Sequence, residues 1–428
     1  MSNRNKRKRY SRKRRKRIFA IEIIVLVCLS VVLFGAIWFT HKMSLINHTE
    51  LDTSRLYTSD QVNNTTETAS GDVSDTTQTQ DLTGIDVIAL VGLDTRPDEE
   101  DVNNSDTMII CVINHNKKEI RLCSLYRDTY LNVINDYYGN PDYYTKANAA
   151  YNYGGAEQFL SMLNLNLDLN ITEYMTVDFK ALAEVVDLLG GLDIDMTKEE
   201  VGHVNNYNVE TSAACGVEYE ALEYPDDPNF DGAITETFHC NGTQAVSYAR
   251  IRYTSGNDFR RASRQREVLT LIKQKAESAD IGTLDSILNA VLPDITTNID
   301  NMKLISVITS AVTYGMGTDT QAGFPFVHVE DDGTRTGDDV VLPVTLAYNV
   351  QKLHEFLFPD EEYSPSETVL NYSQHISDVC GYTSDDIEWA SQIEDGAALE
   401  GISYEDYVAT VNNNSDGSSD NTSGDENS

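Results

Sequence analysis

Basic residues are scarce in this chain once its first 17 residues are set aside. The whole sequence holds 32 Lys and Arg against 68 Asp and Glu, a formal net charge of −36. The first 17 residues contain 11 of those basic residues and no acidic one, so the remainder carries 21 against 68, or −47. This charge excludes a general nucleic-acid binder, because phosphate backbones are bound through Lys and Arg.

Cysteine and the familiar catalytic motifs are also sparse. Six Cys in 428 residues are too few for a small disulfide scaffold. The sequence has no G-x-S-x-G, H-E-x-x-H or Walker loop, and its eight His are scattered without metal-ligand spacing. Hydrophobic residues make up 40% of the chain, which is enough for a packed core.

One long apolar run lies near the N-terminus. It extends from Ile18 to Phe39, 22 residues with Glu22 as the single charge. At a helical rise of about 1.5 Å per residue it would be roughly 33 Å long, close to the thickness of a hydrocarbon core. A cleaved signal peptide is the alternative, but its apolar region would be shorter and would end in small residues. The run therefore predicts an uncleaved transmembrane helix, with the basic arm 1–17 in the cytoplasm and the rest outside.

Two polar segments enclose one folded body. Residues 40–84 are rich in Ser, Thr, Asn, Asp and Gln and predict a flexible extracytoplasmic stalk. Residues 406–428 lead into an acidic run without apolar residues and predict a disordered tail. The folded domain is expected over 85–405.

The body opens with a strand pattern and a hairpin. IDVIALVGLD predicts a buried strand that ends at Asp94. Two β-rich runs then surround a polar turn centred near residues 116–117, a register that places position 106 opposite 127. If the first strand runs beside and parallel to the third, Asp94, Asp106 and Arg127 meet at one end of the sheet. Further patterns predict helices over 148–163, 178–190 and 258–278, strands over 192–196 and 245–253, and an irregular insertion over 205–243.

Arginine is concentrated in one short segment. Six of the 21 basic residues beyond the arm are Arg at positions 250, 252, 260, 261, 264 and 266. On a strand, Arg250 and Arg252 would face the same side. On the following helix, capped by Asp258, the side chains of Arg261, Arg264 and Gln265 would share one face. Such a set predicts an anion site, because guanidinium groups bind two phosphate oxygens at once. The alternative is a solvated helix face, which suits Arg260 and Arg266.

Two carboxylates and four cysteines complete the candidates. Asp94 and Asp106, next to phosphate-binding arginines, predict a Mg²⁺ site, with loop caps or ion pairs as the alternative. Cys111 and Cys123 fall nearly opposite each other on the hairpin, either as a disulfide or as small core residues. A disulfide between Cys215 and Cys240 would close the insertion.

A series of short motifs resembles the LytR-CpsA-Psr family. They appear in the family's order between about residues 85 and 280: GLDTR (92–96), SDTMII (105–110), SLYRDTY (124–130), KANAAYNYGG (146–155), VDF (177–179), GGLDI (190–194) and YARIRY…DFRRASRQREVL (248–269). The chain departs from the family pattern modestly, as in SLYRD, where Ser-Ile-Pro-Arg-Asp is commoner.

The resemblance implies a central mixed sheet with helices on both faces and an apolar pocket for a prenyl chain. It implies an extracytoplasmic phosphotransferase of a bacterial, Gram-positive membrane, which moves teichoic acid, capsule or a related glycopolymer from undecaprenyl pyrophosphate to peptidoglycan. Asp94 and Asp106 match the metal-associated aspartates. The residues matching the pyrophosphate-binding set are Arg127, Arg250, Arg252, Arg261 and Gln265, and Arg264 of the same motif is expected with them.

Physical reasoning on the reaction leaves several points open. Attack of a sugar hydroxyl on the phosphorus needs charge neutralisation and in-line positioning, which Mg²⁺ and Arg127 with the other arginines would supply. Either Asp106 or Asp258 would accept the hydroxyl proton. A lipid-pyrophosphate hydrolase and a non-catalytic envelope regulator are the alternative functions.

Overall fold

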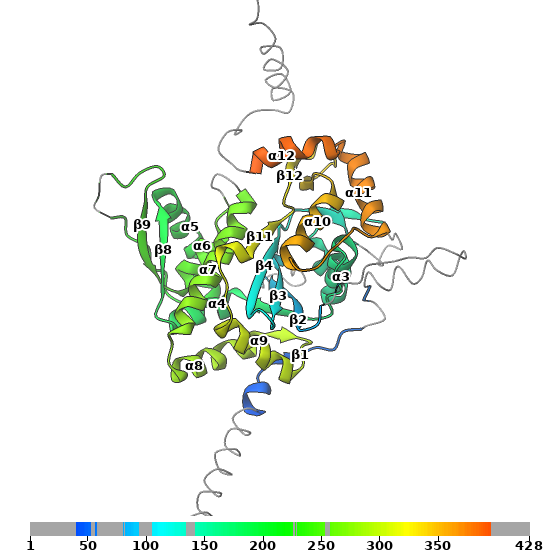
Figure 1. Cartoon of the computed structure of the whole chain (residues 1–428). Helices are drawn as coiled ribbons and strands as arrows, with labels where there is room; N and C mark the ends of the chain where they lie inside the picture. Colours follow the sequence, from blue (N-terminus) through cyan, green and yellow to red (C-terminus); the bar gives the residue numbers. More distant parts are fainter. Residues whose placement is uncertain are drawn as a thin grey trace, which may run out of the picture.

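A seven-stranded mixed sheet lies at the centre of the molecule (Figure 1). The computed structural model describes residues 40–52, 56–57, 80, 82–93, 105–133, 142–225, 227, 229–252 and 257–394. The strands lie in the order β1-β10-β7-β2-β3-β4-β11. Their bounds are Asn47–His48 (β1), Thr296–Thr297 (β10), Tyr174–Asp178 (β7), Ile85–Leu93 (β2), Ser105–Asn114 (β3), Glu119–Leu125 (β4) and Gln321–Phe324 (β11).

The hairpin of β3 and β4 has the predicted register. Ile109 lies opposite Ser124 and Asn114 opposite Glu119, and continuing this register brings position 106 opposite 127. The predicted neighbour of the first strand is wrong, because β2 pairs antiparallel with β3 and parallel with β7. The strands β2 and β4 still run in the same direction, with β3 between them.

Helices cover both faces of the sheet, as expected. Alternate residues of β3 and β4 point to opposite faces, so Ile110 and Cys123 join one hydrophobic core while Ile109 and Leu122 join another. The first core is closed by helices Ala149–Leu167 (α3), Leu346–Leu357 (α10) and Glu367–Cys380 (α11), with Ile387–Glu394 (α12) at its edge. The second is closed by Ile281–Val291 (α8) and Asn301–Thr313 (α9). Two small sheets, Tyr130–Asn132 (β5) with Tyr144–Lys146 (β6) and His328–Asp332 (β12) with Asp339–Pro343 (β13), lie beside the first core.

A third core stands beside the sheet and includes the predicted insertion. Helix Lys198–Cys215 (α5) begins at a capping box in which Thr197 and Glu200 exchange side-chain and backbone hydrogen bonds. Strand Thr235–Cys240 (β9) pairs with Leu192–Thr197 (β8). The prediction of an irregular segment over 205–243 is therefore wrong at both ends. Helices Phe179–Leu188 (α4), Gly242–Arg250 (α6) and Asn257–Glu277 (α7) complete this part.

The segment predicted as a strand over 245–253 is mostly the helix α6. Asn241 and Gln244 form a capping box at its start. Ala245, Tyr248 and Ala249 are buried at helical spacing. Arg250 is the last residue of this helix, and Arg252 lies in the connection beyond it, so the two arginines do not alternate on a strand.

The prediction of a flexible stalk is wrong for its described N-terminal part. Met43, Ile46 and Leu56 are buried, and β1 pairs parallel with β10. These apolar side chains pack into the cores on the two faces of the sheet. The polar composition of the segment as a whole gave no sign of this packing. The predicted span 18–39 and tail 406–428 lie outside the described residues. Within the described ranges, no helix combines the length and apolarity that crossing a bilayer requires.

All five described cysteines are free, namely Cys111, Cys123, Cys215, Cys240 and Cys380. Cys111 lies opposite Leu122, so the Cys123 side chain points to the other face of the sheet. The expectation of a Cys215–Cys240 disulfide is also wrong: Cys215 ends α5, while the buried Cys240 thiol donates to the Phe238 carbonyl oxygen over 3.7 Å.

Candidate functional site

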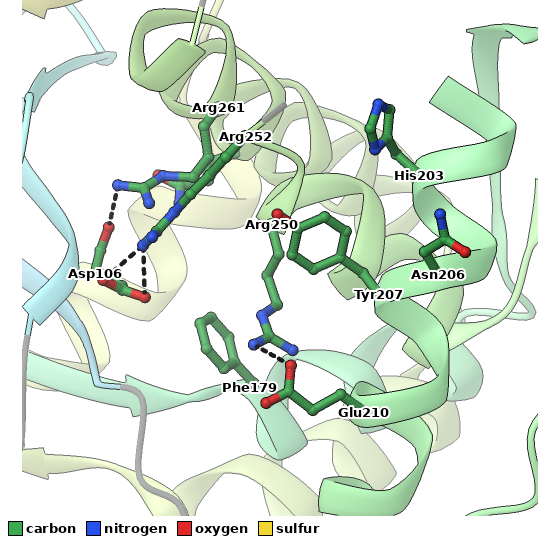
Figure 2. A pocket seen from close by; sticks show the side chains of 10 residues that line it. Asp106, Phe179, His203, Asn206, Tyr207, Glu210, Arg250, Arg252 and Arg261 are labelled. Carbon is green, nitrogen blue, oxygen red and sulfur yellow. Dashed lines mark hydrogen bonds and ion pairs between the residues drawn. The ribbon is translucent and has the colours of Figure 1, made fainter. Parts of the chain in front are cut away.

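A cavity of about 580 Å³ lies between the end of β3 and the helices of the third core. Figure 2 shows two different walls. Asp106, Arg252 and Arg261 form one, while side chains of α5 form the other together with Phe179 and Arg250. The described residues that line it are Asp106, Phe179, His203, Asn206, Tyr207, Glu210, Arg250, Arg252, Arg261 and Gln265.

Asp106 is surrounded by three guanidinium groups. Its Oδ1 lies 2.8 Å from Nη1 of Arg127, and both carboxylate oxygens lie 3.3 Å from Nη2 of Arg252. Arg261 donates from Nη2 to the Asp106 backbone carbonyl oxygen over 3.2 Å. Burial acts to raise the pKa of Asp106, but Arg261, Arg127 and Arg252 together bring that pKa below its ordinary value of 3.8. The carboxylate is thus charged, and it holds the guanidinium groups in place.

One aromatic cluster holds together the two segments that carry Arg127 and Arg261. Tyr126, the residue before Arg127, packs edge-on against Phe259 at 4.7 Å between ring centroids. Phe259 lies two residues before Arg261 in α7, and both rings contact His328. Arg127 itself lies behind Asp106 and does not belong to the cavity lining.

Arg250 is held at the other side of the cavity. Its Nη1 donates to Oγ1 of Thr211 over 2.9 Å, and its Nη2 lies 3.3 Å from a carboxylate oxygen of Glu210. The guanidinium carbon lies 5.2 Å from the ring centroid of Phe179 and 5.9 Å from that of Tyr207. These contacts leave a fixed positive charge that faces the Asp106 cluster across the cavity (Figure 2).

Arg264 does not share this site, contrary to the sequence prediction. Its Nε and Nη2 donate to Oε1 of Glu200 over 3.1 and 2.8 Å, and its Nη1 donates to the Ile251 carbonyl oxygen. Both ionised side chains are buried, so this is a structural ion pair inside the third core. Gln265 does line the cavity. Arg260 is exposed, as expected for a solvated face. Arg266 is instead partly buried, and this burial lowers its pKa.

The predicted metal ligands are only partly described. Asp94 lies outside the described residues. Asp258 lies in the first turn of α7, which begins two residues earlier than a cap at 258 requires, and its side chain is not described. In the described part of the chain, no three His, Cys, Asp or Glu side chains are grouped closely enough to hold a metal ion. Among the described lining residues, Asp106 and Glu210 carry the carboxylates, and Glu210 is paired with Arg250 over 3.3 Å.

Sequence reasoning missed the wall formed by α5. His203, Asn206, Tyr207 and Glu210 line the cavity at the i, i+3, i+4, i+7 spacing of one helix face. Thr197 and Glu200, three residues apart, were the available signal for a helix start. With the helix recognised, this spacing would have placed the four side chains together.

Comparison with known proteins gives one family. The family model described as the LytR_cpsA_psr family matches residues 53–321. Biofilm regulatory protein A of Streptococcus mutans is 31% identical over 223 residues, 50% of each chain. The polyisoprenyl-teichoic acid–peptidoglycan teichoic acid transferase TagU of Enterococcus faecalis is 31% identical over 224 residues, 51% of this chain and 64% of that protein. The aligned part thus spans between half and just under two thirds of these relatives.

The fold also has a counterpart among solved structures. A crystal structure of a Streptococcus agalactiae protein superimposes with a TM-score of 0.50 at 22% sequence identity. The match covers 68% of this chain and 94% of that chain. At this identity the likeness concerns the arrangement of helices and strands alone.

Proposed function

The chain belongs to the LytR-CpsA-Psr family, and from this premise we propose that it transfers a glycopolymer from a polyprenyl pyrophosphate carrier to peptidoglycan. Teichoic acid, capsule or a related polysaccharide is the proposed cargo. The E. faecalis relative, whose name states a teichoic acid transfer from a polyisoprenyl carrier to peptidoglycan, supports this choice.

The single observation that carries the proposal is the surrounded carboxylate Asp106. Arg252 and Arg261 from one wall and Arg250 from the other put three guanidinium groups on the cavity, and Arg127 adds a fourth behind Asp106. Fixed guanidinium groups bind the oxygens of a diphosphate in pairs and stabilise charge that develops there. Of the described residues, Glu210 alone adds a second carboxylate to the cavity lining, against three guanidinium groups, so the site suits an anion.

The proposed reaction is a phosphoryl transfer. A hydroxyl oxygen of the acceptor glycan forms a bond to the sugar-linked phosphorus, and the bond from that phosphorus to the bridging oxygen breaks. Prenyl phosphate leaves with the bonding electrons, and the product is a phosphodiester. The arginines neutralise charge and align the diphosphate, which is the main requirement of such a step.

The proton of the attacking hydroxyl needs an acceptor. The lowered pKa of Asp106 makes this carboxylate a weak base, and its oxygens are engaged by Arg127 and Arg252. We therefore assign Asp106 to holding the arginines, and retain Asp258 as the proposed proton acceptor.

We propose that Mg²⁺ is held by Asp94 and Asp106. The charged Asp106 carboxylate is the kind of oxygen donor that Mg²⁺ prefers, and substrate phosphate oxygens commonly complete such a coordination shell. When bound, the ion would neutralise charge on the phosphate.

We also propose the location of the protein. Residues 18–39 anchor it as a single transmembrane helix, with the arm 1–17 in the cytoplasm and the family domain outside a Gram-positive membrane. The net positive arm and the length of the apolar run support this topology.

The direct test uses the purified full chain, a polyprenyl pyrophosphate-linked glycan, Mg²⁺ and a peptidoglycan oligosaccharide. The expected product is the glycan joined to the oligosaccharide by a phosphodiester, detected by mass spectrometry. Release of the glycan phosphate into water without coupling would indicate a hydrolase instead. Tight binding without any turnover would indicate a regulator.

A further inference from the structure

The two most exposed large hydrophobic side chains of the described residues lie at the starts of neighbouring helices. Ile281 is 87% exposed and Met302 is 71% exposed. They are in the first turns of α8 and α9, which lie together at the lower end of the molecule in Figure 1. An isolated exposed hydrophobic residue needs no explanation, but this pair shares a second property.

Both helices are attached to the chain that follows the predicted membrane span. The ammonium group of Lys42, three residues beyond Phe39, is buried against α8: its Nζ lies 2.7 Å from Oδ1 of Asp285 and also bonds Asn289. Six residues further on, Nε2 of His48 lies 2.7 Å from Oδ1 of Asn301, the first residue of α9.

These contacts limit how far α8 can stand from the bilayer. Residues 40–43 are helical, and three helical residues rise about 4.5 Å, so Lys42 lies within that distance of the end of the span. The headgroup region adds roughly 5–8 Å to each side of the hydrocarbon core. A helix whose side chains bind Lys42 therefore lies at the level of the headgroups.

The composition of α8 suits that position. Its sequence IGTLDSILNAV is largely apolar, yet none of its residues is fully buried in the protein. Next to it, the end of α4 exposes Leu188, which lines a surface hollow together with α8 residues. An amphipathic helix with an apolar face of this kind gains free energy when it enters the headgroup boundary.

The acidic groups nearby do not oppose this contact strongly. In the hollow itself, Glu184 lies 3.7 Å from Lys180, and Asp187 accepts the backbone N–H of Gly242 at the start of α6. Asp285 is neutralised by Lys42, and Lys303 pairs with Asp86 and Glu173. Asp280 and Asp300 each accept two backbone N–H groups at the starts of α8 and α9. Their charges are thus matched by cations or by helix N-termini.

We propose that α8 and the start of α9, with Ile281 and Met302 at their tips, form a membrane-seating surface that rests in the lipid headgroup region. The occupant is the bilayer that the proposed anchor spans, so the inference rests on the anchor assigned above. Because α8 packs against α4, whose first residue Phe179 lines the cavity, this seating fixes the direction of the cavity relative to the membrane.

The test is quenching of tryptophan fluorescence by lipids brominated near the top of their acyl chains. The full chain is reconstituted in such vesicles with Trp38 and Trp389 replaced by Phe and with Ile281→Trp or Met302→Trp introduced. Leu370→Trp is the matched control, because Leu370 is 51% exposed on α11, at the opposite end of the molecule. Loss of emission is expected for Trp at 281 and 302, and not at 370.

A separate measurement distinguishes failure of the anchor from failure of the surface. The Trp389→Phe protein keeps Trp38 at the predicted end of the span, so its quenching reports insertion alone. Quenched Trp38 with unquenched Trp at 281 and 302 overturns the seating surface while leaving the anchor intact. Unquenched Trp38 would contradict the proposed anchor, and the seating surface that depends on it.

Activity gives a second, independent readout. Ile281→Asp with Met302→Asp should lower transfer from a vesicle-borne polyprenyl donor, while transfer from a short-chain donor dispersed in solution stays unchanged. Leu370→Asp should alter neither. Equal loss with both donors in the double variant would indicate a folding defect and contradict the proposal.

Discussion

Nη1 of Arg127 lies 2.8 Å from Oδ1 of Asp106, which joins the segment just beyond β4 to the second residue of β3. The hairpin register fixes this pair, because it places positions 106 and 127 opposite each other. The carboxylate also binds Arg252, and the backbone carbonyl oxygen of Asp106 accepts a hydrogen bond from Arg261. The positive charge of the cavity is therefore in place before any substrate binds, which is the condition for strong electrostatic stabilisation of a transition state.

Arg127→Ala should abolish most of the transfer activity while the fold stays intact. Loss of one preorganised cation from the cluster that neutralises a reacting phosphate typically lowers the rate about a hundredfold or more. Transfer to peptidoglycan oligosaccharide is the measurement, with circular dichroism as the check on folding. Arg260→Ala is the matched control, since the Arg260 side chain is 56% exposed and lies outside the cavity lining. Near-normal turnover of the Arg127 variant would contradict the assignment of this residue to the site.

Arg250→Ala tests the opposite wall. The variant loses the cation that stands between Thr211, Glu210 and the ring of Phe179, so a fall of about a hundredfold or more is again expected. Glu210→Gln keeps the shape of the wall and removes only the ion pair, and it should retain most of the activity. An Arg250 variant as active as the Glu210 variant would show that this wall does not contact the diphosphate.

Asp106→Asn should raise the Mg²⁺ concentration required for transfer, because an amide lacks the charge that binds a hard cation. The pH dependence follows from the lowered pKa of Asp106: this carboxyl stays ionised at pH 5, so the arginine cluster should persist there. Its contribution to stability is present above the ordinary value of 3.8 and is lost as the pH falls through the lowered pKa. Activity that is unchanged in excess EDTA would contradict the metal role.

The sequence allowed local pairings to be predicted better than long-range ones. The β3–β4 register followed from alternation around one short turn, and the face shared by Arg261 and Gln265 followed from helical spacing. Arg264 was misassigned because its partner Glu200 lies 64 residues away, and nothing local distinguishes a buried ion pair from a free anion site. The start of α6 was missed although Asn241 and Gln244 have the spacing of a capping box, because an apolar run followed and was interpreted as a strand.

Arg264→Ala should lower the free energy of unfolding without removing a contact to the phosphate. Removing one partner of a buried ion pair leaves the other charge uncompensated, which costs about 3–5 kcal/mol. Burial acts to raise the pKa of Glu200, but the Thr197 cap and Arg264 bring it below 4.5. Stability from Glu200 is therefore present above pH 4.5 and is lost as the pH falls through its lowered pKa.

Denaturant unfolding of the Arg264→Ala, Glu200→Gln and double variants measures this ion pair. The double variant should be more stable than the sum of the two single losses predicts. Additive losses would contradict a direct pairing.

The cysteines should react in an order set by burial. Burial raises the pKa of Cys111, Cys123 and Cys240 to about 12, so almost no thiolate is present at pH 8. The half-buried Cys215, whose pKa is also raised by burial, should nevertheless be alkylated first of these four. Peptide mass spectrometry of unreduced protein, with and without denaturant, measures this order. A disulfide-linked peptide that contains Cys215 and Cys240 would contradict the structure.

Gly323→Ala should impair transfer through the aromatic cluster. A Cβ at position 323 of β11 would overlap the hydroxyl oxygen and Cζ of Tyr126, so the ring has to move. Tyr126 is buried between Phe259 and His328, and its displacement shifts Arg127 on one side and the start of α7 on the other.

A misplacement of about 1 Å at a reacting centre can lower the rate a hundredfold, so a large loss of turnover is expected in a folded protein. Tyr126→Ala alone should also lower the rate, and adding Gly323→Ala to it should lower the rate little further, because the ring that the new Cβ displaces is then absent. The rates of the two single variants and the double variant, each checked by circular dichroism, provide the comparison. If Gly323→Ala turns over normally, or if the two single losses add in the double variant, the ring does not position these arginines.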